Sequence, residues 1–229
     1  MLKFTPLLLA LIYGLVAWRF STWRLKRELD EKSSELADPR LHALTRQMAQ
    51  ALDLPRIRVN LYEIPAINGL AAPDGRIFLT RGFYNAYRQG QVTAEELASV
   101  IAHELGHVAL GHSRRRMIDF SGQNALRMGL TMVIGRFIPF VGPMLVNAAM
   151  SLLTAKLSRK DEYEADAYAA ALLSKAGIGV GPQISLFTKL EALSGARGAQ
   201  STAWLHSHPA TAERIAAIRA LDKGWNARD

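Results

Sequence analysis

The sequence predicts a mainly helical α+β domain with a small early β-sheet, preceded by an N-terminal transmembrane helix. Three observations predict this class. Apolar residues recur at helical spacing along most of the chain, two short alternating segments lie between residues 57 and 80, and an apolar run opens the sequence. Of the 229 residues, 49% are hydrophobic and 21% are charged. This composition provides a packed core and excludes global disorder.

The first element is the apolar run at residues 4–20, in which Arg19 is the first charge. About 15 to 17 apolar residues is near the lower limit for a spanning helix. A cleaved signal peptide is the rival interpretation, but Leu15 and Ala17 make a poor cleavage site before Trp18. We therefore expect residues 1–25 to form an uncleaved, single-pass membrane anchor.

Basic residues follow the anchor and indicate its orientation. Arg19, Arg24, Lys26 and Arg27 lie after the run, whereas Lys3 and the amino terminus precede it. The positive-inside bias therefore favours a cytoplasmic domain at the inner membrane of a bacterium, with the periplasmic face as the alternative. The lipid bilayer is thus an expected partner.

The remaining chain divides into a polar linker at residues 26–40 and one domain at residues 41–229. Within the domain, apolar spacing, alternation and end signals predict each element in order. The expected elements are a helix at 41–52, a strand at 57–62, a turn at 72–75, a strand at 76–80, a helix opened by the capping box Thr93-x-x-Glu96, an apolar insert at 126–153, a helix at 158–175 stopped by Gly177, and a helix at 209–221.

Composition excludes several kinds of site. The chain has no cysteine, so disulfides, thiolate nucleophiles and Cys-based metal sites are excluded, and a metal would need His and carboxylate ligands. The net charge of +8 is scattered, and no recognised nucleic-acid motif accompanies it. We therefore expect no nucleic-acid partner.

The strongest chemical signal is the sequence His103-Glu-Leu-Gly-His107 within an expected helix. Imidazoles four residues apart project from one helical face and can chelate one ion. Glu104 lies beside them without being a ligand, where it could act as general base on a water molecule. The alternative is a helix whose histidines merely pack or cap.

A hydrolytic metal site needs a third protein ligand. Glu162 and Asp166 share one face of the later helix, so one could ligate while the other accepts the Nδ1–H of a ligating histidine. A solvated acidic face would have the same spacing. Spacing alone therefore leaves the third ligand open.

These motifs together resemble the HtpX-type and CAAX-prenyl-protease-type family of integral-membrane zinc endopeptidases, whose pattern is HExxH followed by ExxxD. Residues 68–83 resemble the turn and edge strand of that family, although Gly69 stands where relatives commonly have Ala. His208-Pro-Ala-Thr-x-x-Arg214 resembles its C-terminal motif. The resemblance covers roughly residues 40–221. It implies a zincin-like fold, one zinc ion per chain and Glu162 as third ligand, which leaves Asp166 as the carboxylate that accepts the Nδ1–H of a ligating histidine.

The expected reaction is hydrolysis of peptide bonds, with zinc polarising the carbonyl and Glu104 moving the proton. The predicted edge strand, with Arg76, Ile77, Phe78 and Leu79, could pair with an extended substrate backbone. An edge covered by the protein's own chain is the alternative. Backbone pairing suits polypeptide substrates that are misfolded or damaged, which indicates protein quality control. A metal-stabilised chaperone or adaptor that binds unfolded chains without cleaving them is the other functional hypothesis, and the oligomeric state is left open.

Two further features have competing interpretations. His208 precedes Pro209 and could cap a helix. The resemblance instead implies a gating histidine that occupies the open metal position or stabilises the oxyanion. The insert at 126–153 lies between the metal motifs, so it must cross a membrane an even number of times, and it is too short for two full spans. We expect a hairpin that covers the site or dips into the bilayer, rather than a pair of soluble core helices.

Overall fold

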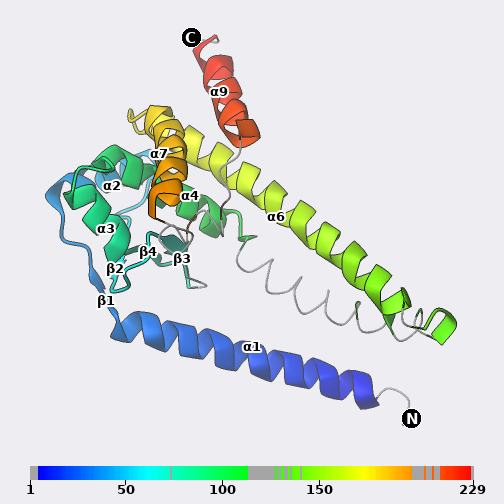
Figure 1. The fold of residues 1–229 in the computed structure, drawn as a ribbon. Coiled ribbons are helices and arrows are strands. Elements are labelled where there is room, and N and C mark those ends of the chain that lie inside the picture. Colours follow the sequence, from blue (N-terminus) through cyan, green and yellow to red (C-terminus); the bar gives the residue numbers. More distant parts are fainter. Residues whose placement is uncertain are drawn as a thin grey trace. The chain divides into compact units, whose positions relative to one another are not determined.

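The computed structural model describes residues 5–72, 74–112, 127, 130–131, 134, 136–139, 141–197, 204, 208 and 212–227. The chain forms two compact units, Met1–Glu28 with Gly111–Asp161, and Leu29–Leu110 with Glu162–Asp229. Most of the described elements are helices, and the second unit contains a small sheet (Figure 1). The predicted α+β class is confirmed.

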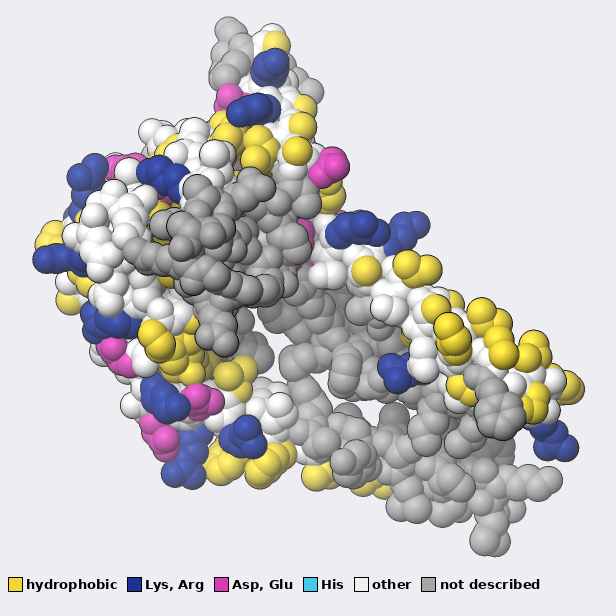
Figure 2. Space-filling model, viewed as in Figure 1, with side chains coloured by type: hydrophobic (Ala, Val, Ile, Leu, Met, Phe, Trp, Pro, Cys, Tyr) yellow, Lys and Arg dark blue, Asp and Glu magenta, His cyan; other side chains and the backbone are white. Residues whose placement is uncertain are grey.

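The first unit contains most of helix α1 (Thr5–Glu31) and the first half of helix α6 (Val141–Lys175). Both helices carry large apolar side chains that are exposed. Among the described side chains of α1, the exposed large apolar ones are Ile12, Val16, Phe20, Trp23 and Leu25. On α6 they gather along its first turns (Figure 2), at Val141, Met144, Leu145 and Leu152.

Within the described residues, every helix falls short of the combined length and apolarity that crossing a membrane requires. The insert at 126–153 lies partly outside the described residues. Its described part includes helical residues up to Phe137, a turn at Pro139 and the start of α6. The prediction that it covers the site or enters a bilayer stays a prediction.

The segment expected to be a linker, 26–40, is structured instead. Helix α1 continues to Glu31, and strand β1 (Ser33–Glu35) follows it. Leu29 and Leu36 are buried, and Leu29 packs with Tyr62 and Phe78. The segment belongs to the fold because its two leucines supply apolar surface to the core, although the residues around them are polar.

The sheet has the strand order β1-β2-β4-β3. Strands β2 (Val59–Tyr62) and β4 (Ile77–Thr80) match the two predicted strands and pair in parallel, whereas β1 and β3 (Gly69–Ala71) pair antiparallel with them. The predicted turn is present, since the Gly75 N–H donates to the Ala72 carbonyl.

The prediction that residues 76–80 form the edge strand is wrong. Strand β4 pairs with β2 on one side and with β3 on the other, so its backbone groups are used within the sheet. Ile77, Phe78 and Leu79 are also fully buried. Among the described residues, the edge next to β4 is strand β3, whose three residues are too few to give a strand pattern in the sequence.

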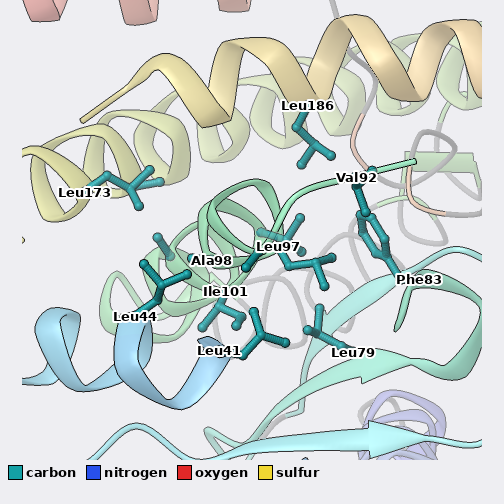
Figure 3. Packing of buried hydrophobic residues seen from close by; sticks show 14 of the residues in the cluster. Leu41, Leu44, Leu79, Phe83, Val92, Leu97, Ala98, Ile101, Leu173 and Leu186 are labelled. Carbon is teal, nitrogen blue, oxygen red and sulfur yellow. The ribbon is translucent and has the colours of Figure 1, made fainter. Parts of the chain in front are cut away.

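Helix α4 (Ala94–Ala109) is the centre of the second unit. Its predicted capping box is confirmed, with Thr93 accepting from the Glu96 N–H and Glu96 accepting from the Thr93 N–H. The helix contacts β3 and β4 as well as helices α2 (Pro39–Ala51) and α7 (Gly181–Arg197). Figure 3 shows apolar side chains from these elements, and from α3 (Arg81–Arg88), meeting around α4: Leu41, Leu44, Leu79, Phe83, Leu97, Ile101 and Leu186. This packing fixes α4 in place.

The later helices differ in extent from the prediction. The helix expected at 158–175 is the second half of α6, which begins at Val141 because the apolar residues before Ser158 continue the helix. Its end is as predicted, with Gly177 at a positive φ of 74° after the last turn. Helix α7 was not predicted. Helix α9 (Ala212–Asn226) corresponds to the helix expected at 209–221.

Candidate metal centre

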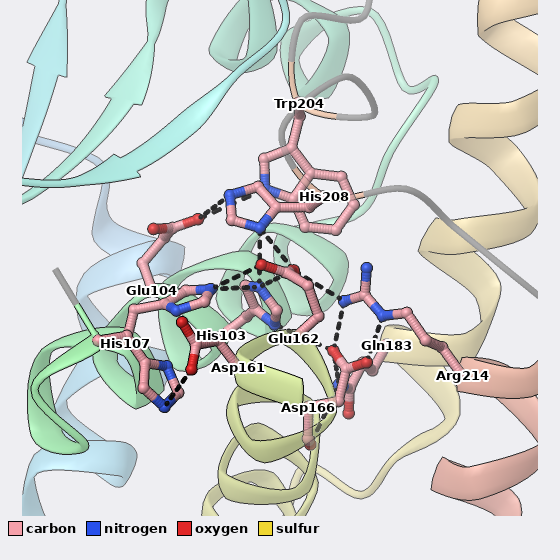
Figure 4. Close-up of polar contacts among 11 residues, drawn as sticks. His103, Glu104, His107, Asp161, Glu162, Asp166, Gln183, Trp204, His208 and Arg214 are labelled. Atoms are coloured by element: carbon pink, nitrogen blue, oxygen red, sulfur yellow. Dashed lines mark hydrogen bonds and ion pairs between the residues drawn. The ribbon is translucent and has the colours of Figure 1, made fainter. Parts of the chain in front are cut away.

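Two helices bring the candidate ligands together. His103, Glu104 and His107 lie on α4, and Glu162 lies on the second half of α6 (Figure 4). All four side chains are buried, at 2–4% exposure. The helices can approach closely because a Cβ atom on Gly106 would lie only 3.1 Å from Ala165 of α6. Gly106 and Ala165 therefore set the distance between α4 and α6, and with it the distance between the ligand atoms of the two helices.

The distances between the donor atoms can be compared with the donor–donor distances around a tetrahedral metal ion. The Nε2 atoms of His103 and His107 are 3.1 Å apart. The Glu162 carboxylate oxygens lie 3.4 Å from the first nitrogen and 3.5 Å from the second. A tetrahedral ion with bonds of about 2.0–2.1 Å separates neighbouring donors by roughly 3.3 Å. The three donors therefore fit one ion of zinc size.

A fourth side chain joins this group. His208 is 7% exposed, and its Nδ1 lies 2.7 Å from a Glu162 oxygen and 3.3 Å from the His103 Nε2. Together, His103, His107, Glu162 and His208 present ligand atoms within 4.8 Å of one another. The structure thus brings His208 to the cluster, as the second interpretation of this residue expected. The capping interpretation remains a prediction, because residues 209–211 lie outside the described residues.

The far side of His103 contacts a buried carboxylate. Its Nδ1 is 3.0 Å from Asp166 Oδ1. Burial by itself lowers the pKa of His103, but hydrogen bonds to Asp166 and Glu162 outweigh it and raise the pKa to about 9. Burial by itself raises the pKa of Glu162, whereas hydrogen bonds with His103 and His208 lower it overall. In the metal-free cluster, these hydrogen bonds therefore favour a positively charged His103 beside a negatively charged Glu162.

Asp166 is held from its other side by Arg214 of α9. The guanidinium donates to both carboxylate oxygens, at 2.6 Å from Nε and 2.8 Å from Nη2. The Gln183 side-chain amide of α7 also donates to Asp166. From the sequence, Arg214 is recognisable only as part of a motif and Gln183 has no predicted role, because neither pattern indicates which distant carboxylate the side chain contacts.

Glu104 lies on the opposite side of the cluster from Asp166 and contacts two aromatic rings. The indole N–H of Trp204 donates to its Oε1 at 3.4 Å, and the Nε2 of His208 is 3.5 Å from the same oxygen. Trp204 is buried and was not identified from the sequence, since an isolated tryptophan gives no signal of its partner.

The edge strand β3 passes close to Glu104. A Cβ atom on Gly69 would lie 3.8 Å from the Glu104 Cγ and 2.5 Å from the Val100 side chain. The strand expected to bind substrate, with Arg76, Ile77, Phe78 and Leu79, is separated from that edge by β3 itself.

Comparisons with known proteins add the following findings. Residues 35–222 match the model of Peptidase family M48. Metalloprotease LoiP of Escherichia coli K12 is 31% identical over 199 residues, covering 84% of this chain and 75% of that protein. Metalloprotease YcaL of the same organism is 28% identical over 192 residues, covering 84% and 72%. The human protein named metalloendopeptidase OMA1, mitochondrial, is 23% identical over 164 residues, covering 69% of this chain and 30% of its own length.

Proposed function

Because the chain belongs to peptidase family M48 and is a metalloendopeptidase, we propose that its metal is zinc, held by His103, His107 and Glu162. The observation that carries this proposal is the donor spacing of 3.1–3.5 Å, which suits tetrahedral zinc. Two imidazoles and one carboxylate form a donor set of catalytic zinc sites and leave a fourth position for the reaction.

Zinc bound there would supply a Lewis acid that polarises the carbonyl of the scissile peptide bond. Glu104 is the general base. It takes a proton from the attacking water and passes it to the leaving amine as the C–N bond breaks. Its buried position on α4, between the two histidines, supports this role.

Asp166 positions His103 for this chemistry. A carboxylate at Nδ1 keeps that nitrogen protonated and leaves Nε2 free to face the metal. The 3.0 Å contact between Nδ1 and Asp166 supports this role. His208 is the gating or oxyanion-stabilising residue, and its approach to Glu104 and Glu162 supports a position beside the reacting carbonyl.

The substrate backbone binds along β3. In an antiparallel pair, the backbone groups of alternate residues point toward and away from the partner strand. The bond from Thr80 N–H to the Asn68 carbonyl and the bond from Ala72 N–H to the Arg76 carbonyl assign residues 68 and 72 to the inward set. The backbone groups of Gly69 and Ala71 therefore point outward, next to Glu104, and an extended peptide can pair with them.

Such pairing uses main-chain groups and therefore suits segments of unfolded or damaged polypeptides. The proposed role is protein quality control. We assign membrane attachment to residues 1–25, supported by the apolar run of the sequence and by the exposed apolar side chains of α1, with the catalytic unit on the cytoplasmic side as the basic residues favour.

Degradation of unfolded casein tests the function directly. Purified full-length protein in detergent should cleave casein with about one zinc ion bound per chain, lose activity with a chelator and regain it when zinc is restored. Binding of casein without cleavage, by zinc-loaded protein, would instead establish a chaperone or adaptor.

A further inference from the structure

The formal charge of the chain is divided unevenly between its two compact units. The first unit, residues 1–28 and 111–161, has 13 Lys and Arg against 3 Asp and Glu, a net charge of +10. The second unit, residues 29–110 and 162–229, has 15 against 17, a net charge of −2. The net charge of +8 of the whole chain therefore comes from the first unit. An anionic surface would attract this unit and not the unit that contains the metal centre.

The first unit also exposes an apolar face on the first half of α6 (Figure 2). Four large apolar side chains there are 51–72% exposed: Val141, Met144, Leu145 and Leu152. Their spacings of three, four and seven residues place them on one face of the helix. The other side of the helix is packed, since Val146 and Met150 are buried. A contiguous apolar face of this kind normally contacts a membrane or a protein partner.

Basic side chains lie at both ends of this apolar face. Lys156, Arg159 and Lys160 are exposed on α6 beyond it, and Arg159 is on the same face because it follows Leu152 by seven residues. Arg136, also exposed, precedes α6. The sequence from residue 120 to residue 160 contains five basic residues and no Asp or Glu. Its charge is therefore complementary to phosphate groups.

Helix α1 has the same order of side chains. Val16 and Phe20 are exposed, Trp23 follows them, and the Arg27 guanidinium lies 5.7 Å from the centre of the Trp23 ring. Tryptophan is enriched at the level of lipid headgroups. In both helices, apolar residues come first and basic residues come last, just before the chain enters the second unit.

The length of the apolar face fits one leaflet of a bilayer. From Val141 to Leu152 the helix rises about 17 Å. The hydrocarbon of one leaflet is about 15 Å thick, half of the full core. With the apolar face in the hydrocarbon, the basic residues beyond Leu152 reach the headgroup level. A second copy of the chain fits this face less well, because two units of charge +10 repel each other.

We infer that the first half of α6 is a second membrane contact, selective for anionic phospholipids. Its apolar face enters one leaflet, and Lys156, Arg159 and Lys160 bind lipid phosphates. The inference goes beyond the attachment assigned to residues 1–25, because it adds a contact and a lipid class, and it does not depend on peptidase activity. A single shallow contact is weak and reversible, so residues 1–25 remain the main anchor.

A fluorescent label on α6 tests the contact in the full-length protein. Because the chain has no cysteine, Met144→Cys provides a single labelling position for an environment-sensitive fluorophore. The protein is reconstituted in vesicles of phosphatidylcholine alone or with about 30% phosphatidylglycerol. In the anionic vesicles the emission should shift to the blue and be quenched by a spin label on the acyl chains. Equal signals in the two kinds of vesicle would overturn the lipid class, and no quenching in either would overturn the contact. A label at Glu213→Cys, exposed on α9, is the control and should stay unquenched.

Charge variants test the assigned residues. The test variant changes three basic residues of α6 to glutamine: Lys156, Arg159 and Lys160. The equilibrium constant for insertion of the Met144→Cys label should fall roughly tenfold to a hundredfold, because each basic side chain near an anionic surface strengthens binding severalfold. The matched control changes three exposed arginines of the second unit to glutamine and should keep full insertion: Arg46, Arg88 and Arg219. Full insertion of the test variant would exclude these α6 side chains as the headgroup ligands.

Salt gives a readout that needs no charge substitution. Raising the salt from about 0.1 M to 1 M shortens the screening length from about 10 Å to 3 Å, so insertion into the anionic vesicles should fall severalfold. Insertion that does not respond to salt would contradict an electrostatic headgroup contact. Energy transfer between labelled copies, without quenching by lipid, would assign the face to a second copy and overturn the inference. Casein cleavage by the same samples reports the proposed peptidase function separately, so either result can fail without the other.

Discussion

Arg214 holds Asp166 through two charge-assisted hydrogen bonds, and Asp166 in turn contacts the imidazole of His103. This chain of contacts joins α9, near the end of the sequence, to the proposed metal ligand His103 on α4. Arg214 is 3% exposed, and its guanidinium also lies 4.8 Å from the centre of the Phe187 ring. The last helix thereby takes part in arranging the centre without supplying a ligand.

Replacement of Arg214 should weaken metal binding. Arg214→Gln removes the partner that orients Asp166, so zinc affinity should fall roughly tenfold to a hundredfold, as expected for contacts that support a ligand. Competition with a chromophoric chelator measures this affinity. Arg219→Gln, an exposed change on the same helix, is the control and should bind zinc like the unaltered protein. Unchanged zinc affinity in Arg214→Gln would show that Arg214 does not support metal binding through Asp166.

Replacement of Glu104 should separate metal binding from catalysis. Glu104→Gln keeps the size of the side chain and removes the base, so casein cleavage should fall by about 10²–10⁴-fold while zinc content stays near one per chain. Elemental analysis and a casein assay measure the two quantities. Glu95→Gln, on the first turn of the same helix, should leave both unchanged. Normal cleavage by Glu104→Gln would exclude Glu104 as the base.

Replacement of Glu162 should abolish tight binding of the metal. Glu162→Ala removes one of three proposed protein ligands, so zinc should be lost on dialysis, and the melting temperature should no longer rise when zinc is added. The comparison is Glu213→Ala, which changes an exposed carboxylate of α9. One tightly held zinc ion per chain in Glu162→Ala would mean that another residue is the third ligand.

The stability of the metal-free protein should depend on pH through Asp166. Burial by itself raises the pKa of this carboxyl group, but hydrogen bonds from Arg214 and His103 outweigh it and lower the pKa overall. A lowered folded-state pKa contributes stability that is present above the unfolded value of about 3.9 and is lost as pH falls through the folded value. The melting temperature in chelator should therefore drop below about pH 5, and Arg214→Gln should show a smaller drop.

Removal of residues 1–25 tests membrane attachment. We expect most of the truncated protein in the soluble fraction after cell lysis and ultracentrifugation, because the apolar run is gone. Retention of the truncated protein in the membrane fraction would show that another segment attaches the protein, such as the start of α6 with its exposed apolar side chains. A mature N-terminus near Trp18, found by mass spectrometry, would show that the run is cleaved.

Local signals predicted the start of the HELGH helix α4 and the end of helix α6 well. The Thr93–Glu96 capping box and the stop at Gly177 depend on residues a few positions apart, so sequence spacing is sufficient to identify them. The same reasoning placed Glu162 and Asp166 on one helical face, and both lie at the cluster with His103.

The features that were not predicted depend on contacts between residues far apart in the sequence. Strand β4 was expected at the edge because of the family resemblance, yet it pairs with β2 and β3 from different stretches of the chain, and this pairing depends on the whole sheet. Trp204 and Gln183 likewise gain their positions from contacts with residues far away in sequence. The spacing of leucines in 26–40 was too sparse to show that Leu29 and Leu36 enter the core.

The close approach of Gly106 to Ala165 has a consequence for ion selectivity. A Cβ atom at Gly106 would meet backbone atoms of α6, so Gly106→Ala would move the two helices apart by a few tenths of an ångström while every donor and the HExxH pattern remained intact. Wider spacing suits an ion with longer bonds, and zinc would lose its advantage over larger divalent ions. In the proposed zinc site, the preference for zinc would therefore depend partly on the small size of Gly106 and Ala165, which the HExxH and ExxxD patterns leave unspecified.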